Sequence, residues 1–205
     1  MLAAFCHDVD HPGVNNAYLV NIKHELAFLH NDKSPLENMH CTVLYEVLRK
    51  PEANVFHKLT SEQWRDARKV MLCAILGTDM VNHFDQISKL QVFAEVNAEQ
   101  LLRMSNDTDD HVIPVFQDAQ NRLFFLEMLV HCADISNPIK PFSICEKWAY
   151  LVCEEFFNQG EKERAEGLPI SPMMDKSKVN IPTMQCNFID FVITPLYLGE
   201  PSLTT

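Results

Sequence analysis

Glycine is scarce in this sequence, with 5 residues among 205, and no segment alternates regularly between apolar and polar residues. Such alternation marks half-buried strands, so its absence argues against a fold built from antiparallel sheet. Long apolar runs are also missing, and we therefore expect no membrane-spanning helix. The apolar residues 1–6 lack a basic flank and lead directly into His7 and Asp8, which is not the pattern of a signal peptide.

Basic residues are also few. Lys and Arg total 17 against 28 Asp and Glu, which gives a formal net charge of −11. A surface of this sign repels the phosphate backbone of nucleic acids, so DNA or RNA binding is disfavoured. The seven cysteines are odd in number and stand singly, mostly among apolar residues. Cysteine in such surroundings behaves as a small hydrophobe, and we expect a reducing compartment, the cytoplasm.

Helical periodicity is the main pattern in the sequence. With 205 residues, 47% of them hydrophobic and 22% charged, the composition is that of one globular domain. Several long stretches repeat apolar residues with a period near 3.6, and we predict an all-α fold. The predicted helices cover residues 35–50, 61–90, 115–133 and 141–159, and a fifth begins near Met184.

The sequence also contains signals for where these helices begin and end. Ser34 and Thr60 can cap the first two, and Pro35 suits a first helical turn. Pro195 limits how regularly the last helix can continue. Residues 105–111 and 161–183 are predicted as loops, and the second is long enough to act as a lid.

A carboxylate continues an apolar stripe on the third predicted helix. Leu123, Leu126, Val130 and Asp134 follow one another at helical spacing, so Asp134 lies in line with core-facing side chains or just beyond them. A buried ionised carboxylate needs a compensating partner, and no Arg or Lys stands one turn away. A metal ion is one solution, and a hydrogen-bonded Asp at a helix end is the other.

Two more helices carry polar side chains on faces that we expect to be buried. The first face is formed by Glu37, His40, Leu44 and Val47, and the second by Met71, Ile75 and Thr78 with Asp79 adjacent. Each polar group has an ordinary explanation, such as a helix-start Glu, a core His or a Thr bonded within its own turn. Together, however, they predict that polar groups from three helices converge.

The segment His7-Asp8-Val9-Asp10-His11-Pro12-Gly13 has the residue types of a metal site. Imidazole with carboxylate suits Zn²⁺, and a carboxylate with free oxygens can also hold Mg²⁺ or Mn²⁺. A capped, solvated turn is the alternative. A zinc protease with His-Glu-x-x-His is a weaker hypothesis, because the Pro-Gly pair breaks the helix which that motif requires.

The order of these motifs resembles the catalytic domain of the cyclic nucleotide phosphodiesterases, particularly their cAMP-specific branch. The similarity spans most of the chain, in the order of the family. It rests on residues 7–16, 34–38 with His40, 78–80 with His83, 131–138, Trp148, 155–157 with Gly160, 170–173, and Gln185 with 188–190.

The resemblance implies a compact, multi-helix domain of the HD type that hydrolyses a 3′,5′-cyclic nucleotide to the 5′-monophosphate at two metal ions. It implies that His7, Asp8 and Asp134 bind Zn²⁺. The second ion, Mg²⁺ or Mn²⁺, shares Asp8. The water molecules of that ion are held by three side chains: His11, Glu37 and Thr78.

The resemblance also implies a nucleotide site formed by Asn137, Val152, Phe156, Met173, Gln185 and Phe188. The Gln185 amide carries a donor and an acceptor and can pair with a purine edge. Phe188 lies on the same helix face three residues later, where its ring can stack on the base. Taken alone, these two residues read as an exposed amide and a core aromatic. Asn137 stands where cAMP-preferring relatives often carry Asn, which favours cAMP over cGMP.

The sequence departs from the family pattern at both ends. The family places a His-Asn-x-x-His element before the His-Asp signature, and that element supplies a further zinc ligand and the histidine that protonates the leaving ribose oxygen. Residues 194–205 contain proline and glycine, and the sequence stops where relatives continue into a further helix. We therefore expect residues 1–205 to form a single partial catalytic domain.

The protein has a second possible function and an expected binding partner. A non-catalytic nucleotide-binding or interaction domain is the second hypothesis, because the upstream element is not among the 205 residues. The expected partner is a cyclic nucleotide, and a homodimer is compatible with the sequence.

Overall fold

The computed structural model describes residues 1–104 and 114–198, and these ranges contain helices and no strand. The prediction of an all-α fold is confirmed, and the predicted loop at 105–111 lies outside the described residues. The helices are α1 (Leu2–Cys6), α2 (Asn16–Asn21), α3 (Glu25–Leu29), α4 (Pro35–Leu48), η1 (Pro51–Ala53), α5 (Ser61–Leu76), η2 (Met80–Asn82), α6 (His83–Val96), α7 (Ala98–Met104), η3 (Pro114–Phe116), α8 (Ala119–Asp134), η4 (Asn137–Ile139), α9 (Phe142–Ala165), α10 (Ile181–Phe188), the π-helix η5 (Ile189–Ile193) and α11 (Thr194–Leu198).

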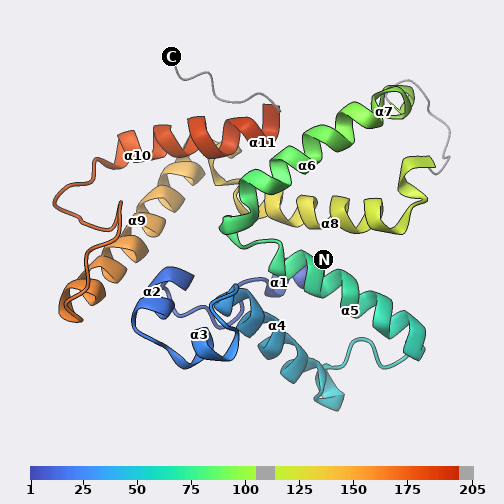
Figure 1. The fold of residues 1–205 in the computed structure, drawn as a ribbon, viewed down its shortest axis with the longest axis horizontal. Helices are drawn as coiled ribbons and strands as arrows, with labels where there is room; N and C mark the ends of the chain where they lie inside the picture. The colour runs from blue at the N-terminus through green and yellow to red at the C-terminus, as the bar shows by residue number, and fades with distance from the viewer. Residues whose placement is uncertain (105–113, 199–205) are drawn as a thin grey trace.

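Helix α5 organises one half of the molecule. Helices α1, α4 and α8 pack against it, and Figure 1 shows α4 and α5 as an antiparallel pair below α8. A buried apolar cluster that includes Leu44, Met71 and Ile75 fills the contact. This packing brings the end of α1 and the end of α8 to the same side of α5.

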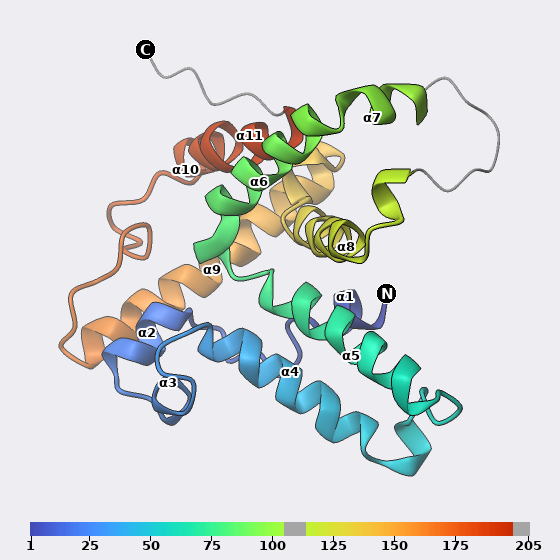
Figure 2. The same ribbon diagram turned by 45° about the vertical axis from the view of Figure 1, so that its right-hand side comes forward.

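Helix α9 crosses the other half of the molecule. It contacts α10 and η4, and Figure 2 shows it running from the α10–α11 region down to α2. A second apolar cluster joins Val14, Tyr18 and Leu36, with Leu168 packed against it. A third joins α6, α8 and α11 through Ile87, Met128 and Leu196. No helix of the described ranges has the length and apolar character needed to cross a bilayer.

The predicted starts of the first two long helices are confirmed, but only one uses the expected cap. At α5, Thr60 accepts a hydrogen bond from the Gln63 amide and Gln63 bonds back to the Thr60 amide, which forms a capping box. At α4, Ser34 makes no side-chain cap. Its hydroxyl donates instead to Asp79 Oδ2 at 2.6 Å, which ties the start of α4 to the region after α5.

The prediction of one continuous helix over residues 61–90 is wrong. Helix α5 ends at Leu76, and the chain turns before α6 begins at His83. Asp79 accepts from the Val81 amide at 3.0 Å and thereby caps η2. Because apolar residues continue on both sides of the turn and no proline marks it, the break is hidden from the periodicity.

Three other helix ends differ from the prediction. Helix α8 begins only after Asp118, because this side chain accepts hydrogen bonds from the first amides of the helix. Helix α9 continues to Ala165, beyond the predicted end at residue 159. Helix α10 begins at Ile181, earlier than Met184, because Asn180 provides its cap.

The segment between α9 and α10 is packed along α9. The amide and the hydroxyl of Ser171 both donate to the buried carboxylate of Glu163, each at 2.6 Å. Gly160 lets the carbonyl of Met174 approach the helix so closely that a Cβ would overlap it. The segment is therefore anchored at its middle.

The same carboxylate is part of a longer chain of hydrogen bonds that is buried at its centre, at Gln159 and Glu163. Gln159 donates to Glu163 at 3.0 Å and to Asn15 Oδ1 at 3.1 Å, and it accepts from the Asn15 amide at 2.8 Å. Asn15 follows the His-Asp segment, so this chain connects that segment through α9 to Ser171.

Candidate metal centre

The structure brings His7, Asp8 and Asp134 together. His7 and Asp8 directly follow α1, whereas Asp134 is the last residue of α8. His7 Nε2 lies 3.0 Å from Asp134 Oδ1 and 3.3 Å from Asp8 Oδ2. The candidate ligand atoms all lie within 4.8 Å of one another. Side chains 127 positions apart in the sequence thus meet at one point.

The orientation of His7 suits a metal ligand. Its Nδ1–H donates to the Ala4 carbonyl at 2.8 Å, which leaves Nε2 facing the two carboxylates. Metal-binding histidines are commonly fixed by such a bond on the other ring nitrogen. Hydrogen bonds to Asp134 and then to Asp8 raise the pKa of His7 to about 11, and the bond to His7 lowers the pKa of Asp8. The cluster attracts positive charge strongly, and its donor set fits a divalent cation.

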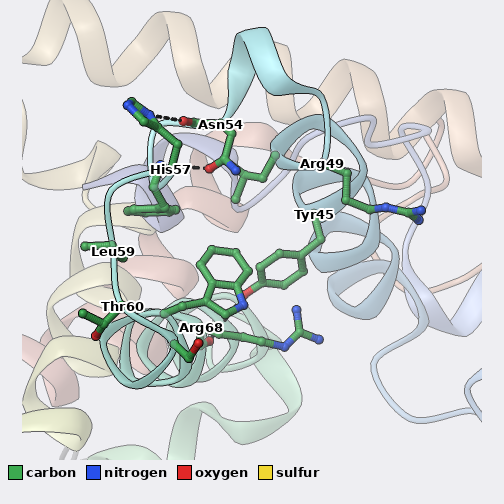
Figure 3. Close-up of a pocket in the computed structure, with 11 residues that line it drawn as sticks. Tyr45, Arg49, Asn54, His57, Leu59, Thr60 and Arg68 are labelled. Atoms are coloured by element: carbon green, nitrogen blue, oxygen red, sulfur yellow. Dashed lines mark hydrogen bonds between the residues drawn. The ribbon is translucent and has the colours of Figure 1, made fainter.

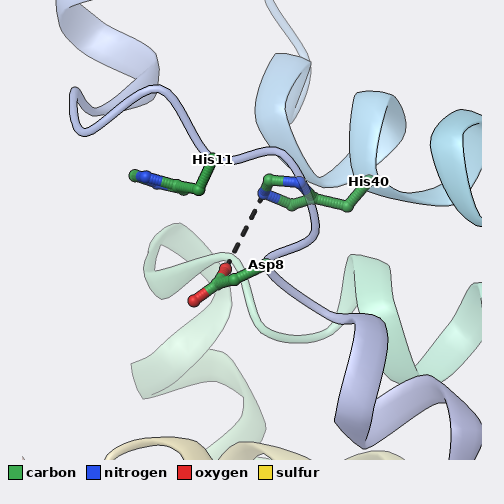
Figure 4. A group of neighbouring side chains, drawn as sticks. All are labelled: Asp8, His11 and His40. Carbon is green, nitrogen blue, oxygen red and sulfur yellow. Dashed lines mark ion pairs between the residues drawn. The ribbon is translucent and has the colours of Figure 1, made fainter.

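A second group of donors shares Asp8. Figure 4 shows the rings of His11 and His40 next to its carboxylate, and Asp8 Oδ1 lies 3.7 Å from His40 Nε2. His40 donates from Nδ1 to the Val9 carbonyl at 2.7 Å, and burial lowers its pKa. A neutral His40 therefore presents the Nε2 lone pair to Asp8. The two oxygens of Asp8 face two different sets of nitrogen ligands.

His40 belongs to the site, although no specific role was predicted for it. The sequence predicted that it lies on the buried face of its helix, three residues after Glu37. This spacing was the sequence feature that indicated a position near Glu37. In the structure its side chain is 1% exposed, and its ring stacks on His11 at a centroid distance of 5.6 Å.

Glu37 is held by a residue that the sequence analysis also missed. Asn16 donates from Nδ2 to Glu37 Oε2 at 2.9 Å, and its own oxygen accepts from the Leu36 amide at 2.9 Å. Burial raises the pKa of Glu37 against the opposing effect of the Asn16 bond, and the charges of Asp79 and Asp8 raise it further. Asn16 was visible only as part of the His-Asp motif.

Thr78 and His11 are oriented by local bonds. The buried hydroxyl of Thr78 donates to the Ile75 carbonyl at 2.7 Å, so the oxygen keeps its lone pairs for a further donor. The Gly13 amide donates to His11 Nδ1 at 3.0 Å, which leaves Nε2–H of a neutral ring as a donor. The role of His11, Glu37 and Thr78 in holding water stays a prediction.

Two residues that we predicted to face the core are exposed instead, so these two predictions are wrong. Val47 on α4 is 41% exposed and Leu126 on α8 is 42% exposed. Helix α8 packs between α5 on one side and α6 with α11 on the other, so its buried positions are Met128 and His131. Asp134 consequently lies at the rim of the core, with its side chain 26% exposed.

The predicted nucleotide-binding residues lie on neighbouring elements. Val152 and Phe156 are one turn apart on α9, and Gln185 and Phe188 are one turn apart on α10, which packs against α9. Two further residues lie on other elements. Asn137 begins η4, where it accepts a hydrogen bond from Lys140 at 3.2 Å, and Met173 lies in the segment after α9 and is 54% exposed. Their participation in one nucleotide site stays a prediction.

Residues 1–199 match the family model described as 3′5′-cyclic nucleotide phosphodiesterase. The mouse high affinity cGMP-specific 3′,5′-cyclic phosphodiesterase 9A is 38% identical over 198 residues, which cover 96% of this chain and 34% of that protein. Isoform F of the Drosophila melanogaster 3′,5′-cyclic-AMP phosphodiesterase is 40% identical over 200 residues, or 96% of this chain and 28% of that protein. The chain thus spans about a third of the length of these relatives.

Solved structures agree with this match. The phosphodiesterase domain of the Salpingoeca rosetta rhodopsin phosphodiesterase superposes with a TM-score of 0.83 at 35% identity, covering 96% of this chain and 56% of that one. These similarities favour phosphodiesterase over zinc protease as the class of the His-Asp segment.

Proposed function

Because the chain belongs to the 3′5′-cyclic nucleotide phosphodiesterase family, we propose that it hydrolyses a 3′,5′-cyclic nucleotide to the 5′-monophosphate in cyclic nucleotide signalling. The observation that carries this proposal is the meeting of His7, Asp8 and Asp134 from distant parts of the chain. An apolar core does not need two carboxylates around one imidazole, whereas a cation site does.

Two divalent ions are part of the proposal. His7, Asp8 and Asp134 would hold Zn²⁺, and Mg²⁺ or Mn²⁺ would use the remaining oxygen of Asp8, which faces His40. When bound, such ions neutralise charge on phosphoryl oxygens and make water nucleophilic at neutral pH. The protein fixes the donors: Ala4 orients His7, and Val9 orients His40.

Three side chains would order water near the second ion. Thr78 offers acceptor lone pairs, His11 offers Nε2–H, and Glu37 is held in place by Asn16. The histidine that would protonate the leaving oxygen belongs to the His-Asn-x-x-His element, which is not among these residues. The chain covers 56% of the solved phosphodiesterase domain, which supports our proposal that it forms a single partial catalytic domain.

For the substrate we propose cAMP over cGMP. Asn137 supports this preference, and Gln185 with Phe188 on one face of α10 would bind and stack the purine, with Val152, Phe156 and Met173 beside them. Curated relatives of both specificities are similar to this chain. All seven cysteines are free in the structure, which supports a cytoplasmic location.

The test is hydrolysis of cAMP and cGMP with Zn²⁺ and Mg²⁺, by the 205-residue chain and by a chain that includes the sequence encoded upstream of Met1. We expect hydrolysis that requires metal, with a higher kcat/KM for cAMP. Failure of the longer protein to hydrolyse either nucleotide while it binds two metal ions would refute the proposal.

A non-catalytic nucleotide-binding domain is the second candidate, since the general-acid histidine is not among the 205 residues. Calorimetry with cAMP separates the two candidates. Saturable cAMP binding without turnover by the 205-residue chain supports the second candidate, and turnover of cAMP by that chain excludes it.

A further inference from the structure

A pocket of about 560 Å³ lies at the far end of the α4–α5 pair. It is formed by the last turns of α4, the connecting residues 54–60 and the first two turns of α5. Nothing in the proposed hydrolysis uses it, because the residues of the candidate metal centre come from the opposite end of α4 and from α1 and α8. Its volume falls within the range of small-molecule sites.

Aromatic rings form the inner surface of this pocket. Trp64 meets Tyr45 edge to face, with ring centroids 6.0 Å apart, and meets Phe56 at 5.8 Å. All three rings are only half-buried, so apolar surface is available to a guest. Flat aromatic surfaces of this kind favour a planar ring as the partner.

The charge of the pocket is opposite to that of the whole chain. The chain carries −11, yet the pocket lining contains Arg49, Arg68 and His57 and no carboxylate. Within residues 1–104 and 114–198, no ion pair joins either guanidinium group to an acidic side chain. Arg68 lies over the Tyr45 ring at 4.0 Å. Two guanidinium groups without an acidic partner therefore border an aromatic surface.

The two guanidinium groups lie on one side of the pocket. Figure 3 shows Arg68 beneath the Tyr45 ring and Arg49 on the α4 side of Tyr45, extending away from the rings, with His57 and Leu59 across from both arginines. Ser61 at the first turn of α5 adds a hydroxyl group and the positive end of a 16-residue helix. Arginine pairs with phosphate through two parallel hydrogen bonds, so each of the two arginines that line the pocket is a suitable partner for a phosphate group.

We propose that this pocket binds a planar aromatic ring that carries a phosphate group, as a nucleoside 5′-monophosphate does. The ring packs against Tyr45 and Trp64, and the phosphate pairs with Arg49 and Arg68. This site is separate from the candidate metal centre and does not depend on the proposed hydrolysis.

The experiment uses the fluorescence of Trp64. Trp64 and Trp148 are the two tryptophans of the chain, so Trp148→Phe leaves a single reporter in the pocket. Titration with 5′-AMP should change this fluorescence saturably. Adenosine and inorganic phosphate should each bind at least about tenfold more weakly, because each provides only one half of the interaction.

Variants locate the binding. Arg49→Gln and Arg68→Lys should each weaken 5′-AMP binding about tenfold, since each removes charge-assisted hydrogen bonds. Arg65→Gln, on an exposed position of α5 outside the pocket, is the matched control and should bind normally. Asp134→Asn should also leave this binding unchanged, which distinguishes the pocket from the metal centre.

Either of two results would overturn the proposal. The first is no saturable fluorescence change up to about 10 mM 5′-AMP, beyond the range of a specific site. The second is unchanged affinity in Arg49→Gln, which is exposed at the end of α4 and can be replaced without disturbing the core. Thermal unfolding curves of each variant verify that it is folded.

Discussion

Asp134 is the side chain whose loss should affect the candidate metal centre most directly. Its carboxylate faces His7 Nε2 at 3.0 Å from the end of α8. Asp134→Asn keeps the size of the side chain and removes its charge. Loss of a residue that only supports a metal ligand lowers metal affinity by up to about 100-fold, so loss of a ligand should lower zinc affinity by at least that factor. Metal-dependent turnover should disappear while helix content by circular dichroism stays the same.

The matched control is Asp66→Asn, an exposed carboxylate on α5 outside both donor groups. It should retain the zinc content of the unmodified protein, measured by elemental analysis after dialysis. Equal zinc content in the Asp134 and Asp66 variants would remove Asp134 from the metal centre.

Glu163 gives the stability of the protein a specific dependence on pH. Its burial opposes ionisation, but bonds from Ser171 and Gln159 outweigh burial and lower the pKa of Glu163. A folded-state pKa below the unfolded value of about 4.3 stabilises the fold above that pH, and this stabilisation is lost as the pH falls through the folded-state pKa.

We therefore expect Glu163→Gln to lower the melting temperature most at neutral pH, and the difference from the unmodified protein to shrink between about pH 5 and pH 3. Glu166→Gln, an exposed neighbour, should show no such convergence. Parallel melting curves for Glu163→Gln and the unmodified protein across this range would contradict the assignment.

At the scale of elements, the contact between α9 and the segment after it depends on Gly160. A side chain there would overlap the carbonyl oxygen of Met174, and a backbone atom cannot turn aside. Gly160→Ala should therefore destabilise the protein by about 1–3 kcal/mol in urea unfolding, despite the better helix propensity of alanine. Trypsin should also cleave faster at Lys176 and Lys178.

Asn158→Ala is the control, because this residue is exposed on the same helix. It should be neutral or slightly stabilising. A Gly160→Ala protein as stable as Asn158→Ala would mean that the segment can move away from α9 at no cost.

The elements that the sequence predicted best are those with local start signals. Thr60 is readable because a cap bonds to an amide within three residues of itself, and Pro35 suits a first helical turn although Ser34 makes no cap. The turn at residues 77–82 was missed because the apolar periodicity continues across it, although Gly77 ends α5 and Asp79 caps η2; contacts from elsewhere also hold this turn. Ser34 reaches Asp79 from another helix, and Gln86 donates to the Gly77 carbonyl at 2.9 Å.

The same distinction applies to the candidate site. His7 and Asp8 stand in a short motif and Asp134 continues an apolar stripe, which made them candidates, but the resemblance to the family was needed to join the three as one ligand set. His40 and Asn16 hold their places through Val9 and Leu36, which are distant in sequence or ordinary in type. Periodicity says which face of a helix is buried but does not identify the group that it meets there.

At the scale of the whole molecule, metal binding should stabilise the fold. The candidate ligands follow α1 and end α8, and a cation held between them opposes the separation of these helices. At 100 times its Kd a ligand adds about 2.7 kcal/mol, which for 205 residues raises Tm by about 5–10 °C. Differential scanning fluorimetry with Zn²⁺ and with EDTA measures this shift.

Asp134→Asn separates specific binding from general salt effects. In that variant the difference between zinc and EDTA should shrink to a small fraction of the original. A shift of the same size in the variant would place the stabilising ion elsewhere on the molecule.

The row of hydrogen bonds that runs from Asn15 through the buried Gln159 and Glu163 to Ser171 restricts how such a domain can change over evolution. These hydrogen bonds connect the loop that carries His7 and Asp8 to the segment that carries Met173. The distance between these two segments therefore depends on four side chains, and altering any one of them should shift both segments at once.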